Sequence, residues 1–128
     1  MGKRNRRRTS EDGPRPEKPV APSSDYTDAY GATLTLRGAL SPATRRDYAQ
    51  VLTGAGGRPS DTQEDAWQRA VELLFERLAV RWVIAGAPIE RQRELLMRFR
   101  VASTEERAWI RMVLREHLAE NFPDVQAP

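Results

Sequence analysis

The stretch QEDAWQRAVELLFERLAVRWVIA, residues 63–85, carries the strongest periodic pattern in the chain. Large apolar side chains recur in it at spacings of four, three, four and four residues, at Trp67, Val71, Leu74, Leu78 and Trp82. Such spacing places all five on one face of an α-helix, and charged side chains fill the opposite face. The pattern therefore predicts a long amphipathic helix over residues 63–85 at the centre of a hydrophobic core.

Two further helices are predicted downstream of this stretch. Gly86 suits the left-handed C-cap of the long helix, and Pro88 suits the first turn of a helix over residues 88–100. Ser103 is followed three residues later by a glutamate, which is the spacing of a capping box. That box predicts the start of a last helix over residues 103–121.

The segment upstream predicts a β-hairpin and one shorter helix. Residues 33–37 alternate leucine with β-branched or polar side chains, the period of a half-buried strand, and residues 26–27 are its expected hairpin partner. Ser41 and Pro42 suit the N-cap and first position of a helix. Because the connections between helices are short, antiparallel packing is favoured. The predicted fold is mainly α, a small bundle of about four helices with a minor N-terminal β-hairpin.

Residues 1–24 differ in composition from the rest of the chain. They hold seven Lys and Arg against three Asp and Glu, together with four prolines, whereas residues 25–128 hold 14 Arg against 15 Asp and Glu. A segment with so few large apolar side chains buries too little surface to offset its ordering entropy. We therefore expect a disordered basic tail over residues 1–24 and a single domain over residues 25–128.

Composition also excludes several classes of protein. The chain has no cysteine and one histidine, which excludes disulfides and thiolate metal sites. No apolar signal region follows the basic N-terminus, and charged residues interrupt every apolar stretch, so we expect a cytoplasmic protein without a membrane span. The glycines of residues 54–57 lack the lysine and hydroxyl of a phosphate-binding loop. With no nucleophile motif either, the sequence predicts no enzyme activity, cofactor or metal.

The last helix carries the candidate partner-binding residues. Arg107, Arg111 and Arg115 recur every four residues, and Trp109 lies between the first two in the sequence. An amphipathic aromatic residue close to arginines is typical of binding hot spots in protein interfaces. Two alternatives stay open. Nearby glutamates can neutralise the arginine row on a solvated face, and Trp109 can lie at the edge of the core.

The tail carries the candidate nucleic-acid-binding residues. These are the five basic side chains of its first cluster, Lys3, Arg4, Arg6, Arg7 and Arg8. Such a cluster contacts phosphates without reading sequence and releases counterions as it binds. A helix-turn-helix made by the last two helices is disfavoured, because Glu105 and Glu106 would bring negative charge to phosphates.

The sequence thus leaves two functional predictions. The first is a non-enzymatic adaptor or regulatory protein that binds a protein partner through the face of its last two helices. The alternative is a protein associated with RNA or DNA and anchored by its arginine-rich tail. The two predictions are compatible, and pairing of two copies into a homodimer is a further alternative that the sequence leaves open.

Overall fold

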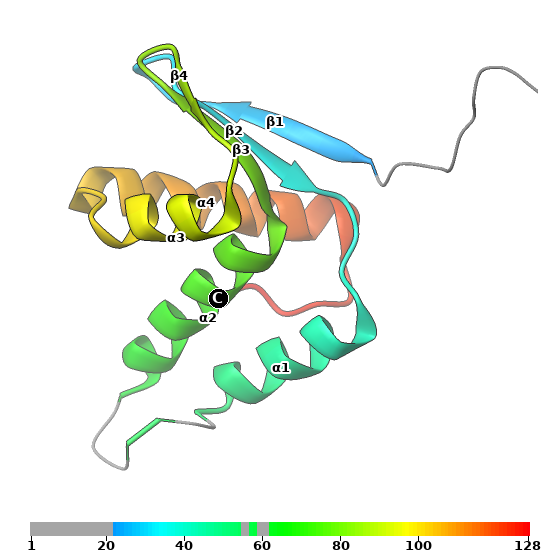
Figure 1. Cartoon of the computed structure of the whole chain (residues 1–128). Coiled ribbons are helices and arrows are strands. Elements are labelled where there is room, and N and C mark those ends of the chain that lie inside the picture. The colour runs from blue at the N-terminus through cyan, green and yellow to red at the C-terminus, as the bar shows by residue number, and fades with distance from the viewer. Residues whose placement is uncertain (1–21, 55–56, 59–61) are drawn as a thin grey trace, which may run out of the picture.

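The computed structural model describes residues 22–54, 57–58 and 62–128, and within them the chain forms four helices and four strands (Figure 1). In chain order the elements are β1 (Ser23–Thr27), β2 (Thr33–Arg37), α1 (Pro42–Leu52), α2 (Gln63–Leu78), β3 (Ala79–Ile84), β4 (Ala87–Ile89), α3 (Gln92–Arg100) and α4 (Thr104–Asn121).

The strands form one antiparallel sheet in the order β1-β2-β3-β4. It is built from two hairpins, β1–β2 and β3–β4, which join where β2 pairs with β3. The pairing register places four large side chains in one row across the sheet, namely Tyr26, Leu34, Trp82 and Ile89. Because side chains alternate between the faces of a sheet, this row turns one face into a core surface.

The helices lie on that face of the sheet (Figure 1). Figure 1 shows α3 and α4 beneath the strands, with α2 below them and α1 alongside α2. The side chains of Leu34, Leu36, Leu74, Phe75 and Leu114 are wholly inaccessible to solvent and share one core cluster. On the other face of the sheet, Thr33 and Thr35 remain partly exposed. The core therefore lies between one face of the sheet and the helices.

The predicted mainly helical bundle with a minor hairpin is wrong, because the structure combines four helices with a four-stranded sheet. The predicted helix over residues 63–85 ends at Leu78 and continues directly as β3. Trp82 is buried as predicted, but it reaches the core from a strand, where it pairs with Leu34. The residues of β3 are mostly β-branched or aromatic, and pairing with β2 favours the extended conformation for them.

The predicted roles of Gly86 and Pro88 are also wrong. Ala85 and Gly86 have positive φ angles of 51° and 79° and form the two-residue turn between β3 and β4. Positive φ at both central positions is typical of a type I′ hairpin turn, and glycine adopts it without steric cost. Pro88 lies in β4 at the edge of the sheet, where its missing N–H is tolerated, and α3 begins only at Gln92.

Other local predictions are confirmed. Residues 26–27 pair with the strand at residues 33–37 as predicted, and their strand begins earlier than predicted, at Ser23. Ser41 caps α1, with Pro42 at its first position, and Ser103 forms a complete capping box with Glu106 at the start of α4. No helix among the described residues is long and apolar enough to cross a membrane. The predicted basic tail falls mostly on residues 1–21, outside the described residues.

Candidate functional site

Arg111 lies on the side of α4 that faces α2. Its Nη1 donates to Glu64 Oε2 at 3.0 Å, and its guanidinium lies over the ring of Trp67, 5.4 Å from the ring centre. Glu64 and Trp67 both belong to the first turns of α2. An ion pair and a cation–π contact together hold the guanidinium between the two helices.

Arg107 occupies the same side of α4, one turn earlier. Its Nη2 donates to the backbone oxygen of Arg100 at 2.7 Å, and its guanidinium lies 5.3 Å from the centre of the Phe99 ring. Cations on the last turn of a helix stabilise its free carbonyl groups. Arg107 therefore caps the C-terminal end of α3 while remaining exposed to solvent on its other side.

Two adjoining hollows run between α2 and this side of α4. Their volumes are about 280 and 210 Å³, and Gln68 and Arg107 line both. The first is lined in addition by Asp65, Arg69, Glu72 and Phe99, and the second by Glu64, Val71, Thr104, Ala108 and Arg111. Both carboxylates and guanidiniums line each hollow, so the hollows do not present a single sign of charge.

Trp109 lies on another side of α4 from the arginines. It is two residues away from both Arg107 and Arg111, which is about 200° around an α-helix. Its ring is half-buried against the core cluster and lines a hollow of about 80 Å³ at the turn between β1 and β2. The structure therefore brings Arg107 and Arg111 together with α2 but separates Trp109 from them and places it at the edge of the core.

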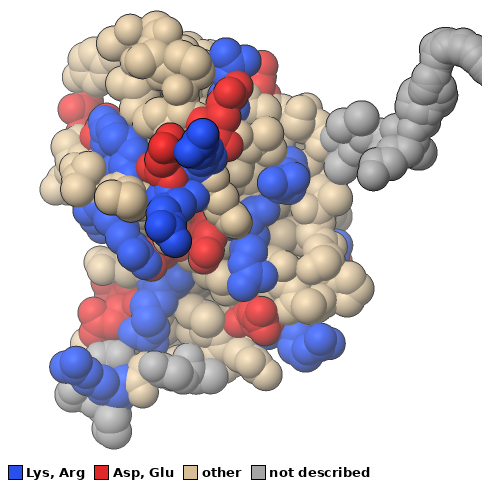
Figure 2. Space-filling model, in the orientation of Figure 1, with Lys and Arg blue, Asp and Glu red and all other residues tan. Residues whose placement is uncertain are grey.

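Most arginines of the last two helices have partners. Arg98 makes two hydrogen bonds with the Glu106 carboxylate, at 2.7 and 3.3 Å, and these bonds hold the pKa of Glu106 below its usual range. Arg100 binds Glu72 in the same two-pronged way at 3.1 and 3.2 Å. Arg115 is exposed and forms no ion pair with a described residue. In Figure 2, basic and acidic side chains are interspersed over the face in view.

The single histidine belongs to the core. His117 is wholly buried, and its Nε2–H donates to the carbonyl oxygen of Arg37 at 2.6 Å. Its Nδ1 lies 2.8 Å from the hydroxyl of Tyr26 and 3.3 Å from Nδ2 of Asn121. Because both ring nitrogens are engaged within the protein, His117 fixes α4 to the β1–β2 hairpin.

Sequence reasoning missed a set of exposed apolar side chains. Met97, Val101 and Met112 are 59%, 77% and 54% exposed, and Tyr30 is 78% exposed. Met97 and Val101 are four residues apart and lie off the buried stripe of α3 formed by Leu95 and Phe99. Their position off the stripe was the signal in the sequence for their exposure, because apolar residues outside the stripe of a surface helix face solvent.

The basic cluster of Lys3, Arg4, Arg6, Arg7 and Arg8 lies outside the described residues, so its predicted contacts stay a prediction. Comparison of the chain with known proteins found no matching family model, no similar curated protein and no similar solved structure.

Proposed function

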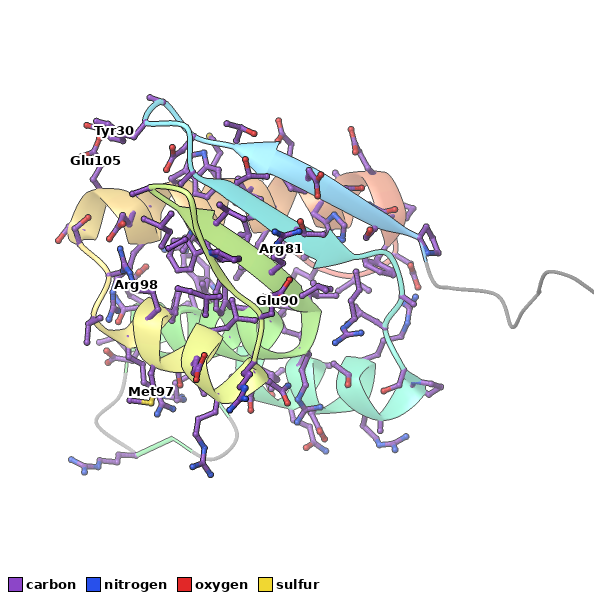
Figure 3. All side chains as sticks on the ribbon, turned by 45° about the horizontal axis from the view of Figure 1, so that its top comes forward. Tyr30, Arg81, Glu90, Met97, Arg98 and Glu105 are labelled. Carbon is purple, nitrogen blue, oxygen red and sulfur yellow. The ribbon has the colours of Figure 1, made fainter. Side chains whose placement is uncertain are left out.

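We propose that this protein is a non-enzymatic adaptor that binds a protein partner on the outer surface of its last two helices. One observation supports this proposal above others. Of the four large apolar side chains that are more than half exposed among the described residues, three lie on α3, on α4 or directly after α3: Met97, Val101 and Met112. Figure 3 shows Met97 pointing away from the body of the protein.

The chemistry of these side chains suits reversible contact with a protein. Burial of apolar surface contributes roughly 25 cal/mol per Å², and methionine adapts its unbranched chain to irregular partner surfaces. Arg115 lies three residues after Met112 and is exposed, so it can add a polar contact at the rim of such an interface.

The proposal is tested by proximity crosslinking and affinity purification from the native host with the double variant Met97→Ser, Val101→Ser. We expect at least a fivefold loss of the specific partner relative to the unchanged chain. The matched control is Arg46→Ser, Gln50→Ser, two exposed residues with the same spacing on α1. Equal partner recovery with both variants, each folded by circular dichroism, would refute the proposal.

The tryptophan singled out from the sequence is a poorer test. Trp109 is half-buried and packs against the core cluster, so Trp109→Ala removes core contacts as well as surface. A loss of binding in that variant would not separate a partner contact from lower stability. The exposed pair Met97 and Val101 avoids this ambiguity.

We also propose, as a second candidate function, association with RNA or DNA through the basic tail. The observation that favours it is the excess of basic residues in the first 24 positions, seven against three acidic residues. The full chain is compared with a chain lacking residues 2–21, which leaves β1 intact. We expect salt-sensitive binding that is lost with the deletion, whereas binding that is insensitive to salt would rule this function out.

A further inference from the structure

The outer edge of β1 carries no partner strand among the described residues. β1 is the first strand in the sheet order and pairs only with β2. Its five residues include no proline and no lysine, the residues that commonly protect such edges. Every second residue of an edge strand directs its N–H and C=O groups outward, where they can pair with an added extended segment.

Helix α4 runs alongside this edge. The hydroxyl of Tyr26, near the end of β1, lies 2.8 Å from Nδ1 of His117. The hydroxyl of Tyr30, in the turn after β1, donates to Oε2 of Glu105 at 3.1 Å. Figures 1 and 3 both show α4 passing under the β1–β2 hairpin, and Figure 3 shows Tyr30 beside Glu105. The strand and the helix therefore form two walls of one extended surface.

That surface is lined by acidic side chains. They come from the turn after β1 and from α4, and we call them the acidic edge: Asp28, Glu105, Glu116 and Glu120. Glu116 directly precedes His117, whose Nδ1 lies 2.8 Å from the Tyr26 hydroxyl, and Glu120 lies one helical turn after Glu116 on α4. Burial raises the pKa of Tyr26, and the nearby charges of Glu120 and Glu116 raise it further. At the other end of this surface, the Glu105 carboxylate accepts a hydrogen bond from the Tyr30 hydroxyl.

The acidic edge is not neutralised by described arginines. Elsewhere on these helices carboxylates pair with arginine, as in Glu106 with Arg98 at 2.7 Å and Glu64 with Arg111 at 3.0 Å. None of the acidic-edge carboxylates forms an ion pair with a described residue. Negative charge is thus concentrated beside an open strand edge, and this combination selects an extended basic segment.

The chain itself contains a segment rich in basic residues. Residues 3–8, KRNRRR, hold five basic side chains and no proline, and residues 9–22 connect them to β1. Fourteen residues can span up to roughly 46 Å, whereas the eight residues from the start of β1 to Tyr30 span roughly 26 Å. The segment can therefore reach any point on the acidic edge. Covalent linkage also gives it an effective concentration on the order of millimolar.

We propose that the outer edge of β1 and the acidic edge bind the chain's own basic segment, residues 3–8. Backbone groups of β1 pair with the segment, and the carboxylates of the acidic edge neutralise its guanidinium and ammonium groups. This inference concerns a different surface from the one proposed for the adaptor partner and does not depend on it. Its functional consequence is that a docked segment is withheld from competing polyanions.

The experiment uses a spin label on the full chain. Because the chain has no cysteine, Asn5→Cys provides a single attachment site within the basic segment. Paramagnetic broadening of backbone amide signals is then measured at β1 and at residues 116–120, with residues 46–50 of α1 as the reference. We expect broadening at least about fivefold stronger at β1 and residues 116–120 than at α1, and loss of the difference in about 0.5 M salt.

A triple variant tests the contribution of the carboxylates. In Glu105→Gln, Glu116→Gln, Glu120→Gln the selective broadening should disappear, whereas the control Glu76→Gln, Glu94→Gln, which changes carboxylates outside the acidic edge, should retain it. Selective broadening that survives the triple variant would overturn the proposal, as would equal broadening of all surfaces. A mixture of the spin-labelled chain with an isotope-enriched chain that lacks the spin label detects binding between molecules. If broadening appears only in that mixture, the edge binds a second molecule, and the proposal is overturned as well.

Discussion

At the scale of single residues, His117 shows how one buried polar side chain links distant parts of the chain. Its two ring nitrogens meet Tyr26 and Arg37, which lie 91 and 80 positions away in the sequence. The ring also packs edge-on against Tyr26 and Phe122, with centres 5.7 and 5.9 Å apart. These contacts join the first hairpin to α4 and to the segment after it.

The variant His117→Ala should be among the more destabilising single substitutions in this domain. It removes a buried ring and leaves the Tyr26 hydroxyl and the Arg37 carbonyl without their partner, which costs about 2–4 kcal/mol of unfolding free energy. Urea unfolding at pH 7 measures the loss. Arg115→Ala, on the exposed side of the same helix, serves as control and should change stability by less than about 0.5 kcal/mol. Equal effects of the two variants would contradict the structural role of His117.

Glu106 should make stability depend on pH in the acid range. Its pKa is lowered by hydrogen bonds from Arg98 and from the Ser103 backbone, so its contribution is present above the unfolded-state pKa, near 4.3, and is lost as pH falls through the lower folded-state value. At pH 7, Glu106→Gln should cost roughly 1–2 kcal/mol. Below about pH 4 the variant should lose less stability than the unchanged chain, as urea midpoints across this range would show. If the stability of Glu106→Gln and that of the unchanged chain vary in parallel with pH, the lowered pKa of Glu106 is contradicted.

At the scale of elements, the junction between α2 and β3 determines the architecture. Leu78 ends the helix and Ala79 begins the strand with an extended backbone, without any intervening loop. Val71, Leu74, Leu78 and Trp82 all reach the core, because a buried strand that follows a helix can continue the same apolar spacing. Periodicity alone therefore did not reveal the change of conformation.

The turn between β3 and β4 offers a stabilising substitution. Ala85 has a φ angle of 51°, in the left-handed region that asparagine tolerates better than alanine, and Gly86 already occupies the next position. We expect Ala85→Asn to stabilise the protein by about 0.5–1 kcal/mol and to raise Tm by roughly 2–6 °C. Differential scanning calorimetry measures the shift. Gly86→Ala, which places a Cβ at a φ of 79°, should lower Tm, and a fall in both variants would contradict the turn geometry.

At the scale of the whole molecule, the pairing of β2 with β3 joins the two hairpins into one sheet. The two strands are separated by α1 and α2, yet Leu34 lies opposite Trp82 and both are almost wholly buried. A core that includes both sheet and helices should unfold as one cooperative unit.

Leu34→Ala tests this cooperativity. Removal of a wholly buried leucine side chain should cost about 3–4 kcal/mol, with helix signal and tryptophan fluorescence lost at the same urea concentration. Thr35→Ala, on the opposite face of the same strand, should cost less than about 1 kcal/mol. Separate midpoints for the two signals would show that the hairpins and the helices do not share one core.

The positions and partners of the exposed side chains could be predicted from the sequence only in part. The spacing of Arg107, Arg111 and Arg115 correctly indicated that the first two share one side of α4. Their partners on α2 and α3 could not be inferred, because ion pairs such as Arg111 with Glu64 join residues 47 positions apart. The exposure of Met97 and Val101, in contrast, could have been inferred, because both lie off the apolar stripe of Leu95 and Phe99.

Features that local physics controls could be predicted from the chain alone. Capping by Ser41 and Ser103 and the pairing of residues 26–27 with the strand at residues 33–37 depend on side chains close together in the chain. Residues 79–84, in contrast, form a strand because of a long-range contact, since their conformation depends on pairing with β2, more than forty residues earlier. That pairing also left β1 at the sheet edge beside α4, because strand order and edges arise from contacts that no local pattern encodes.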